Sequence, residues 1–473
     1  MTRICELRNL HLVTYENGLR LQQKLAEMRQ TDLIPDQLLL LEHPPVITLG
    51  RGGDPRNLLA SDDVLRRERV RFYETTRGGD ITYHGPGQLV GYPILHLGEG
   101  SRDVRKFVTR LEELLIRTVA EYGITAARVD GKRGIWVRNE KIAAIGVRIA
   151  KWVTSHGFAL NVNTNLEHFR LITPCGLQGT GVTSIARQIG HEVPLDDVRA
   201  IVAAKFGEVF DREIVPREAT LRLVKVMIHD GGRVLLLHRK PERGNFWQPI
   251  TGSIEDGETP MQTAEREIVE ETGNRAEPEE LGLQQSFMIE SQYLEARHPA
   301  PIIASEIGYA ARLDGGVAIH MDNDEHDDFG WFSFAEAYEK IRWTDDREAL
   351  ERLEGSVSSR ALRGSGVGRE ARSTSHPPAQ VPRYARNDSD DEQASRRPSA
   401  VVENPRSRRS RQASGYEADQ RSRAEHGLSG SALPEHLRML ERRHRDLHDP
   451  RRDLHASLHV LRGRPWHAAR SRC

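Results

Sequence analysis

The most informative segment of the sequence is Arg77-Gly-Gly-Asp-Ile-Thr-Tyr-His-Gly-Pro-Gly-Gln88. It contains four glycines, a proline and a histidine in twelve residues. Glycines let a backbone approach a ligand closely and leave its amide groups free to donate hydrogen bonds. A tight turn between two strands would explain the same composition. The sequence on either side of the stretch has to decide between a binding loop and a simple turn.

Strand patterns lie on both sides of this glycine-rich stretch. Residues 38–50 predict a buried strand that is interrupted by Pro44-Pro45. Residues 134–149 predict two strands that form a hairpin and turn at Asn139-Glu140. The glycine-rich stretch therefore lies within a sheet-forming region.

A helix pattern lies between these strands. The apolar spacing from Ser101 to Tyr122 is typical of an amphipathic helix, with Ser101 as its expected N-cap and Gly123 as its expected end. Strands and helices thus alternate along residues 1–215. This mixture predicts an α/β domain.

Cys175 is a candidate nucleophile, because it stands between Pro174 and Gly176 in a segment that can present a side chain on irregular backbone. Acyl transfer from a thioester needs a nucleophile that is also a good leaving group, a group that controls its protonation, and donors for the oxyanion. A thiolate meets the first need. A single cysteine is more often structural, so the neighbouring motifs carry the argument.

A second His-Gly pair occurs in Ser155-His-Gly-Phe-Ala-Leu-Asn-Val-Asn163, beside an apolar run. A strand that contains a hydrogen-bonded histidine would explain this segment equally well. The pair gains weight because it is one of several motifs that occur together. In order, these are residues 43–51, 77–88, 141–146, 155–163, 174–176 and 181–185.

The order and spacing of these motifs resemble the lipoyl(octanoyl) transferase (LipB) family over nearly all of residues 1–215. The family fold is α/β, like that of the biotin and lipoate protein ligases. The resemblance implies transfer of octanoyl from octanoyl-acyl carrier protein to a lysine of lipoyl domains, those of the 2-oxoacid dehydrogenases and the glycine cleavage H protein. This reaction belongs to lipoate biosynthesis and protein lipoylation, and it uses no cofactor.

The resemblance also implies roles for single residues. Cys175 would form the acyl-thioester, and Lys141 would lower the pKa of that cysteine and serve as acid and base. Lys132 and Lys151 are close in sequence but do not match the motif. The implied substrate-binding residues are Arg77, Gly78, Gly79, Asp80, Ile81, Thr82, Tyr83, His84, Ala144, Ile145, Gly146, Gly157, Phe158 and Ala159. The alternative activity within this fold is ATP-dependent ligation, which needs no nucleophilic cysteine and is therefore disfavoured.

The pattern of elements restarts near Pro216. Residues 221–238 predict a hairpin that turns at Asp230-Gly-Gly232, and residues 261–271 predict a helix that ends at Gly273. A further helix is expected around residues 345–353. We therefore expect a second domain over residues 216–354.

A cluster of carboxylates marks this second domain. Glu267, Glu270 and Glu271 stand at i, i+3 and i+4 and share one helix face. Like charges at this spacing repel one another unless a cation neutralises them, and oxygen-rich clusters suit Mg²⁺ or Mn²⁺. A solvated acidic helix face is the ordinary alternative.

The segments Gly252–Glu258 and Arg266–Gly273 together resemble the Nudix box, in which Asn274 departs from the usual apolar residue. The family is an α/β/α sandwich of metal-dependent hydrolases that act on nucleotide-like diphosphates. The resemblance implies that the three glutamates bind metal and that Arg266 holds the loop to the helix. Segments around residues 246–252, 324–326 and 343–349 resemble the dihydroneopterin triphosphate pyrophosphatase branch, in which Glu325 would be a further metal ligand or base.

The last part of the chain follows other compositional rules. Residues 355–473 contain 24 arginines, no lysine and 14 acidic residues, and aromatic residues nearly vanish there. We expect this low-complexity tail to be disordered. A basic arm that binds nucleic acid is the alternative, but few aromatic residues accompany the arginines, so we expect no nucleic-acid partner.

The distribution of apolar residues and the number of cysteines limit the class of protein and its compartment. The chain has no run of 18 apolar residues and no apolar N-terminal segment, so we expect neither a membrane partner nor a signal peptide. Three cysteines are too few for a disulfide framework and indicate a reducing cytoplasm. Two hypotheses remain for the whole chain. It is a bifunctional transferase and pyrophosphohydrolase, or one of its two domains serves only as a binding module.

Overall fold

The computed structural model of the chain describes residues 3–173, 181–289, 301–321 and 324–364. Cys175 and the arginine-rich tail beyond residue 364 lie outside the described residues. Across the described residues, no helix combines the length and the apolar character needed to span a bilayer.

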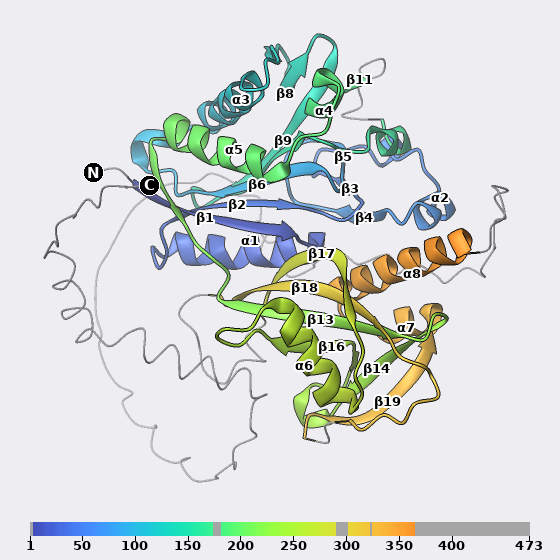
Figure 1. Cartoon of the computed structure of the whole chain (residues 1–473). Coiled ribbons are helices and arrows are strands. Elements are labelled where there is room, and N and C mark those ends of the chain that lie inside the picture. Colours follow the sequence, from blue (N-terminus) through green and yellow to red (C-terminus); the bar gives the residue numbers. More distant parts are fainter. Residues whose placement is uncertain (1–2, 174–180, 290–300, 322–323, 365–473) are drawn as a thin grey trace, which may run out of the picture.

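Two groups of strands make up the described part of the chain, one before and one after residue 217 (Figure 1). The strands of the first half are β1 (Arg3–Leu12), β2 (Asp36–Glu42), β3 (Val46–Leu49), β4 (Arg71–Glu74), β5 (Ile81–His84), β6 (Gln88–Ile94), β7 (Ala127–Val129), β8 (Lys132–Val137), β9 (Glu140–Ala150), β10 (Val153–Asn161), β11 (Gly181–Val182) and β12 (Arg212–Pro216). Those of the second half are β13 (Leu221–His229), β14 (Arg233–Arg239), β15 (Trp247–Gln248), β16 (Ile250–Ser253), β17 (Pro278–Met288), β18 (Ile303–Arg312) and β19 (His326–Ser333).

Helices cover both groups of strands. The helices of the first half are α1 (Tyr15–Gln30), α2 (Asp62–Arg67), α3 (Val104–Ala120), α4 (Ile185–Ile189) and α5 (Leu195–Phe210). Those of the second half are α6 (Pro260–Thr272), α7 (Phe334–Lys340) and α8 (Thr344–Gly364). Short 3₁₀ segments and turns complete the connections, among them Pro55–Asn57 and Leu166–Leu171.

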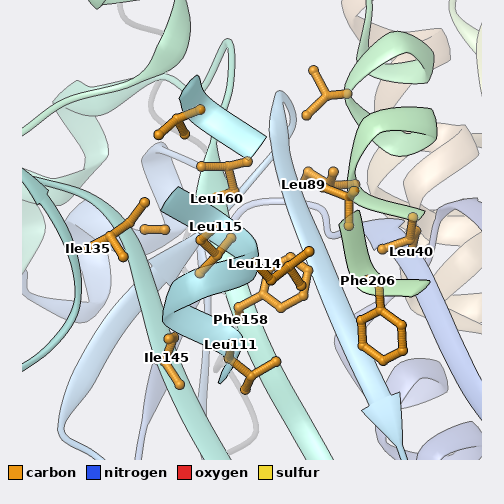
Figure 2. Packing of buried hydrophobic residues seen from close by; sticks show 14 of the residues in the cluster. Leu40, Leu89, Leu111, Leu114, Leu115, Ile135, Ile145, Phe158, Leu160 and Phe206 are labelled. Carbon is orange, nitrogen blue, oxygen red and sulfur yellow. The ribbon is translucent and has the colours of Figure 1, made fainter. Parts of the chain in front are cut away.

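In the first half, helices pack on both faces of one sheet with the order β1-β2-β6-β10-β9-β8-β7. Alternate residues of each strand point to opposite faces. Leu38 and Leu40 of β2 therefore join the apolar residues of α3 and α5, whereas Leu39 and Leu41 join those of α1. Figure 2 shows the first of these clusters, in which Leu111, Leu114 and Leu115 of α3 pack against Ile135, Phe158, Leu160 and Phe206. The strands between the helices are thus buried on both faces.

A small sheet with the order β4-β3-β5 stands beside the large one. The Pro44-Pro45 interruption separates β2, in the large sheet, from β3, in the small sheet. The glycine-rich stretch therefore supplies a strand to each sheet, since β5 pairs with β3 and β6 pairs with β2. The space between the two sheets is where these strands, β9 and β10 come together.

The second half is an α/β/α sandwich. Val224, Val226 and Ile228 of β13 pack with Ala264 and Ile268 of α6 on one face. Met227 of β13 packs on the other face with residues of α7 and α8, including Ala337, Ala349, Leu350 and Leu353. The Nudix fold that the sequence predicts for this half is confirmed.

The two halves join edge to edge in one continuous sheet. Strand β1 pairs in parallel with β17 through Leu12 and Gln285, so that the strand order runs β18-β17-β1-β2. The apolar clusters cross the same border. Leu12 packs among residues of the second half, and Ile303 of β18 packs among residues of the first half.

Most of the expected elements are present, and two of their ends differ. Asp103, not Ser101, caps α3, because the Asp103 carboxylate accepts hydrogen bonds from the backbone amides of Arg105 and Lys106. The last helix, α8, runs to Gly364 and so continues past residue 354, where we expected the second domain to end.

Candidate functional site

A cavity of about 270 Å³ lies where the two sheets of the first half meet. All three stretches that the sequence singled out as substrate-binding contribute to its wall. From these stretches and from the predicted acid–base position, the lining residues are Arg77, Gly79, Asp80, Ile81, Thr82, His84, Lys141, Ala144, Ile145, Gly146, Gly157, Phe158 and Ala159. Gly78 and Tyr83 belong to the same stretches but do not line the cavity.

The loop before β5 is held in place by its own polar side chains. The Arg77 guanidinium, which is buried, donates to the backbone oxygen of Thr48 at 2.7 Å and to the Thr48 hydroxyl at 2.9 Å. The Asp80 carboxylate accepts hydrogen bonds from the Asn57 side chain at 2.7 Å and from the Asp54 amide at 3.1 Å. These contacts fix the glycine-rich loop without using the cavity itself.

Glycines are required where β9, β10 and the loop approach one another. Gly146 of β9 pairs with Gly157 of β10. A methyl group at Gly146 would stand 2.8 Å from the Gly78 carbonyl oxygen, and one at Gly157 would stand 2.1 Å from the Gly91 carbonyl oxygen. Real side chains essentially never come this close to backbone atoms, so β9 can reach the loop only because Gly146 carries no side chain, and β10 can approach β6 only because Gly157 carries none.

The inner end of the cavity is built from buried rings. Tyr15, His84, Tyr92 and His156 line the cavity and are buried. His43 stands behind them, with ring nitrogens 2.6 Å from the Tyr92 hydroxyl and 2.6 Å from the Val13 carbonyl oxygen. Burial lowers the pKa of His43 to about 4 and that of His156 to about 3, so both rings are neutral near pH 7.

The more exposed part of the cavity wall is cationic. Gly131 and Arg133 are exposed there, Lys132 is half-buried, and Lys141 lines the same cavity as a buried residue. The Lys132 and Lys141 ammonium groups lie 4.9 Å and 4.8 Å from the centre of the Trp136 ring. Such contacts attract a cation to the face of an indole. Trp136 thus holds two amines in the wall of the cavity.

Cys175, the predicted nucleophile, lies outside the described residues, but the chain on both sides of it is described. Before the gap, the Thr173 amide donates to the Asn57 carbonyl oxygen at 2.7 Å. After the gap, β11 pairs with β9, where Val182 is the partner of Lys141. The chain therefore returns to the side of Lys141 seven residues after Cys175.

Several cavity residues were missed by the sequence analysis. Tyr15, Val90, Tyr92, Gly131 and Arg133 lie outside the quoted binding stretches or at positions without a distinctive pattern. His156 was part of a quoted motif but was not singled out as a site residue. No local signal marks Tyr15, because it reaches the cavity only through the packing of α1 on the sheet.

The second candidate site lies on α6. Arg266 donates to Glu258 at 3.0 Å and to the Ser253 carbonyl oxygen at 3.1 Å, so it holds the preceding loop to the helix as the motif implied. The same guanidinium reaches Glu267 and Glu270, each at 2.8 Å. Arg266 therefore offsets part of the carboxylate charge on this face.

Glu267 lies in a cradle of backbone. A methyl group at Gly252 would fall 2.0 Å from a carboxylate oxygen of Glu267, so the glycine leaves the space in which this carboxylate lies. Burial raises the pKa of Glu267 to about 8, although Arg266 opposes the shift. A carboxylate held in such a place favours a nearby positive charge.

Glu271 and the β19 end of the sheet face each other. One carboxylate oxygen of Glu271 is buried without a hydrogen-bond partner, although His326 Nδ1 lies 3.1 Å away. Glu325 pairs with Arg239 at 3.0 Å and with Arg243 at 2.8 Å. Within the described residues, no three acidic, histidine or cysteine side chains converge closely enough to define a metal site by themselves.

Comparisons with known proteins cover both halves. The lipoyl protein ligase A/B catalytic domain matches residues 14–207, and the NUDIX domain matches residues 220–353. An octanoyltransferase from Myxococcus xanthus is 43% identical over 350 residues, which cover 72% of this chain and 96% of that protein. An octanoyltransferase from Caldicellulosiruptor saccharolyticus is 49% identical over 47% of this chain and 97% of its own length. The solved structure of the E. coli dihydroneopterin triphosphate pyrophosphohydrolase is 28% identical over 28% of this chain and 93% of that chain, with a TM-score of 0.26.

The match to the Myxococcus protein is longer than the first half of this chain, so the similarity extends into the second half. Both halves thus have counterparts in one relative. The chain belongs to the octanoyltransferase family, and a NUDIX domain follows its catalytic domain.

Proposed function

We propose that the first half transfers octanoyl from octanoyl-acyl carrier protein to a lysine of lipoyl domains through a thioester on Cys175. The observation that carries the proposal is the cavity, which has a mostly apolar wall, buried rings at one end and Lys141 among its lining residues. Its volume of about 270 Å³ is near the lower limit of ligand pockets, which suits a medium-length acyl chain better than a long one.

In the first step, the Cys175 thiolate attacks the thioester carbonyl of the carrier-bound octanoyl group. The bond between this carbonyl and the carrier sulfur breaks, and the carrier thiolate leaves and takes up a proton. Lys141, whose ammonium group Trp136 holds in the cavity wall, supplies that proton. Backbone amides of the glycine-rich loop serve as donors to the oxyanion.

In the second step, the ε-amine of the acceptor lysine attacks the octanoyl-Cys175 carbonyl. An amide bond forms, the Cys175 thiolate leaves, and the amine proton returns to Lys141. Neither step requires a cofactor, since the thioester bond of the donor supplies the driving force.

Intact-mass measurement tests this proposal. After the full chain is mixed with octanoyl-acyl carrier protein, we expect one octanoyl adduct. The adduct should be absent in Cys175→Ser and present in Cys5→Ala, because Cys5 is buried in the core behind the sheet. An adduct that persists in Cys175→Ser would rule out this residue as the nucleophile.

We propose in addition that the second half hydrolyses a nucleotide-like diphosphate with the help of Mg²⁺ or Mn²⁺. Two features of α6 fit a divalent cation. The Gly252 cradle accommodates the Glu267 carboxylate, and a buried oxygen of Glu271 has no hydrogen-bond partner. Glu267, Glu270 and Glu271 would hold the ion, with the Gly252 carbonyl as a further donor and Glu325 as a further ligand or base.

When bound, the ion would supply a polarised water and offset the charge of the diphosphate. The chain itself positions the carboxylates. Arg266 fixes Glu267 against the loop and keeps Glu270 turned towards it. The ion pairs of Glu325 with Arg239 and Arg243 fix the position of that carboxylate.

Release of phosphate or pyrophosphate from nucleoside diphosphate derivatives tests the second activity. We expect the release to depend on Mg²⁺ and to be abolished by Glu270→Gln. Glu265→Gln is the matched control, because Glu265 is exposed on the same helix and is not among the proposed ligands. Full activity of Glu270→Gln would contradict the metal site.

The alternative is that one of the two proposed units, residues 1–215 or 216–354, only binds. The intact cavity in the first unit and the α6 carboxylates in the second favour two activities over one. Turnover by only one unit, measured on the same preparation, would decide for the alternative.

A further inference from the structure

The helix α8 of the second half touches the start of α1 in the first half. Asn17 donates a hydrogen bond through its side-chain amide to the Asp345 carboxylate at 3.3 Å, and both groups are buried. The Thr344 hydroxyl donates to the Thr14 hydroxyl at 3.2 Å. The N-terminal turns of the two helices therefore fix each other by polar contacts away from water.

The start of α8 is in turn fixed to the sheet of the second half by charge. Lys225 of β13 is 1% exposed, and its ammonium group lies 2.6 Å from carboxylate oxygens of both Glu306 and Asp346 and 4.0 Å from Asp345. Gln285 donates to Glu306 at 2.8 Å. Asp345 therefore contacts α1 from a helix end that buried ion pairs fix to the sheet of the second half.

Further along, α8 also touches β4 of the small sheet. Arg69 donates to the Glu351 carbonyl oxygen at 3.1 Å and to the Glu354 carboxylate at 2.7 Å. Arg71 lies 3.8 Å from the Glu351 carboxylate. In Figure 1, α8 accordingly starts near one end of α1 and runs below β4, where the two halves face each other.

Helix α1 and strand β4, the two elements that α8 contacts, come together at Tyr15, which lines the acyl cavity. Tyr15 is the first residue of α1 and follows Thr14 directly. Its ring lies 5.3 Å from that of Tyr73 on β4 and 5.3 Å from that of His43, measured between ring centres. Its hydroxyl donates to Thr75 at 3.2 Å, just beyond β4.

We propose that Asp345 and Glu351 of the NUDIX half are positioning residues that set Tyr15 in the wall of the acyl cavity of the transferase half. The second half thereby determines how well the acyl chain is bound. Tyr15 lies on α1, whereas Lys141 lies on β9 and is held by Trp136, so a shift of Tyr15 affects binding of the chain more than the position of the reacting atoms. The inference rests on the proposed transfer reaction.

Steady-state rates of the full chain with octanoyl-acyl carrier protein test this inference. Asn17→Ala, which removes a buried hydrogen bond, should raise KM by about fivefold. Glu351→Gln, which removes the charge that faces Arg71, should raise KM in the same direction, and both variants should change kcat by less than about twofold. Glu279→Gln is the control, because Glu279 forms an ion pair with Arg360 in which both side chains are exposed. The control should leave both constants unchanged.

Exchange of the two partners separates positioning from a general loss of stability. In the double variant Asn17→Asp with Asp345→Asn, donor and acceptor change places, and KM should return to within about twofold of the original value. An unchanged KM in both Asn17→Ala and Glu351→Gln would overturn the inference. A lower melting temperature of these variants with no change in KM would overturn it as well. If the unaltered chain forms no octanoyl adduct, the transfer reaction fails first and the inference fails with it.

Discussion

At the scale of single residues, two amines in the wall of the cavity offer a direct comparison. Lys132 and Lys141 lie at nearly equal distances from the Trp136 ring, but only Lys141 matches the transferase motif. We expect Lys141→Ala to lower kcat by about 10²–10⁴-fold, the usual range for loss of a general acid and base. Lys132→Ala should lower it by less than tenfold. Equal losses in the two variants, measured as octanoyl transfer, would contradict the assignment.

The lowered pKa of His156 predicts how the free energy of unfolding depends on pH. Burial lowers its pKa to about 3, so below pH 6.5 the unfolded chain binds a proton that the folded chain does not. The free energy of unfolding therefore falls as pH drops from 6.5, by about 2 kcal/mol at pH 5 for this residue. His156→Asn keeps a residue that tolerates the positive φ of 55° and removes this loss.

Denaturant unfolding at pH 7.5 and pH 5 measures the effect. The difference between the two pH values should be smaller in His156→Asn than in the original chain by about 2 kcal/mol. Exposed His191 provides the control, and His191→Asn should leave the difference unchanged. An equal difference in the original chain and in His156→Asn would show that the imidazole is not kept neutral by burial.

The residues of the cavity were predictable to the extent that they belong to short motifs. Sequence motifs mark Arg77, Gly146 and Gly157, because close backbone approach requires glycine and a fixed loop requires an anchoring side chain. Tyr15 and Tyr92 are ordinary aromatic residues in amphipathic elements, and only tertiary packing brings them to the cavity. Their roles depend on partners that are distant in the sequence, such as His43 and Thr75.

At the scale of elements, α8 is longer than its sequence pattern indicated. Beyond Glu354 it carries Val357, which packs against the apolar cluster of the second half, and Arg360, which pairs with Glu279 at the surface. A chain that ends after Gly364 should melt at the same temperature as the full chain. A chain that ends after Glu354 should melt about 1–2 °C lower, because it loses about 1 kcal/mol of apolar burial at Val357.

Calorimetry of the two truncated chains checks this prediction. The surface pair of Arg360 should add little, since exposed ion pairs contribute weakly. Arg360→Ala in the longer chain is the control and should shift the melting temperature by less than a degree or so. Identical melting of both truncated chains would mean that the last turns of α8 add nothing.

Elements with local signals were predictable, and those that depend on distant partners were not. The hairpin of β8 and β9 follows from alternation around a tight turn, and α6 ends at Gly273 in the left-handed conformation, as its sequence indicates. The cap of α3 differed because Ser101 and Asp103 compete for the same helix start, and the side chain next to the first turn prevails. No local pattern could show that β1 and β17 would become neighbours.

At the scale of the whole molecule, the shared sheet predicts one cooperative unit. Leu12 of the first half packs within the core of the second, and Ile303 does the reverse. We expect a single calorimetric transition for the full chain. Leu12→Ala should move the whole transition, at a cost of about 2–5 kcal/mol, because it leaves a cavity in the joint.

The matched control for this variant is Leu33→Ala, since Leu33 is 69% exposed. It should leave the transition in place. Two separate peaks in the original chain, or a shift of only part of the transition in Leu12→Ala, would show that the halves unfold independently.

The path of β1 has a consequence for solubility. On one side β1 lies against β2 along most of its length, but on the other it is covered by two different segments, with β12 along Arg3–Leu7 and β17 at Leu12. If the second half were removed, the backbone amides and carbonyls at the end of β1 near Leu12 would lose their partners. This bare strand margin would lie next to the apolar face that the side chains of Leu10 and Leu12 form. Such margins recruit strands from neighbouring molecules. The isolated first half would therefore self-associate through β1, and the second half acts as the built-in cover that prevents it.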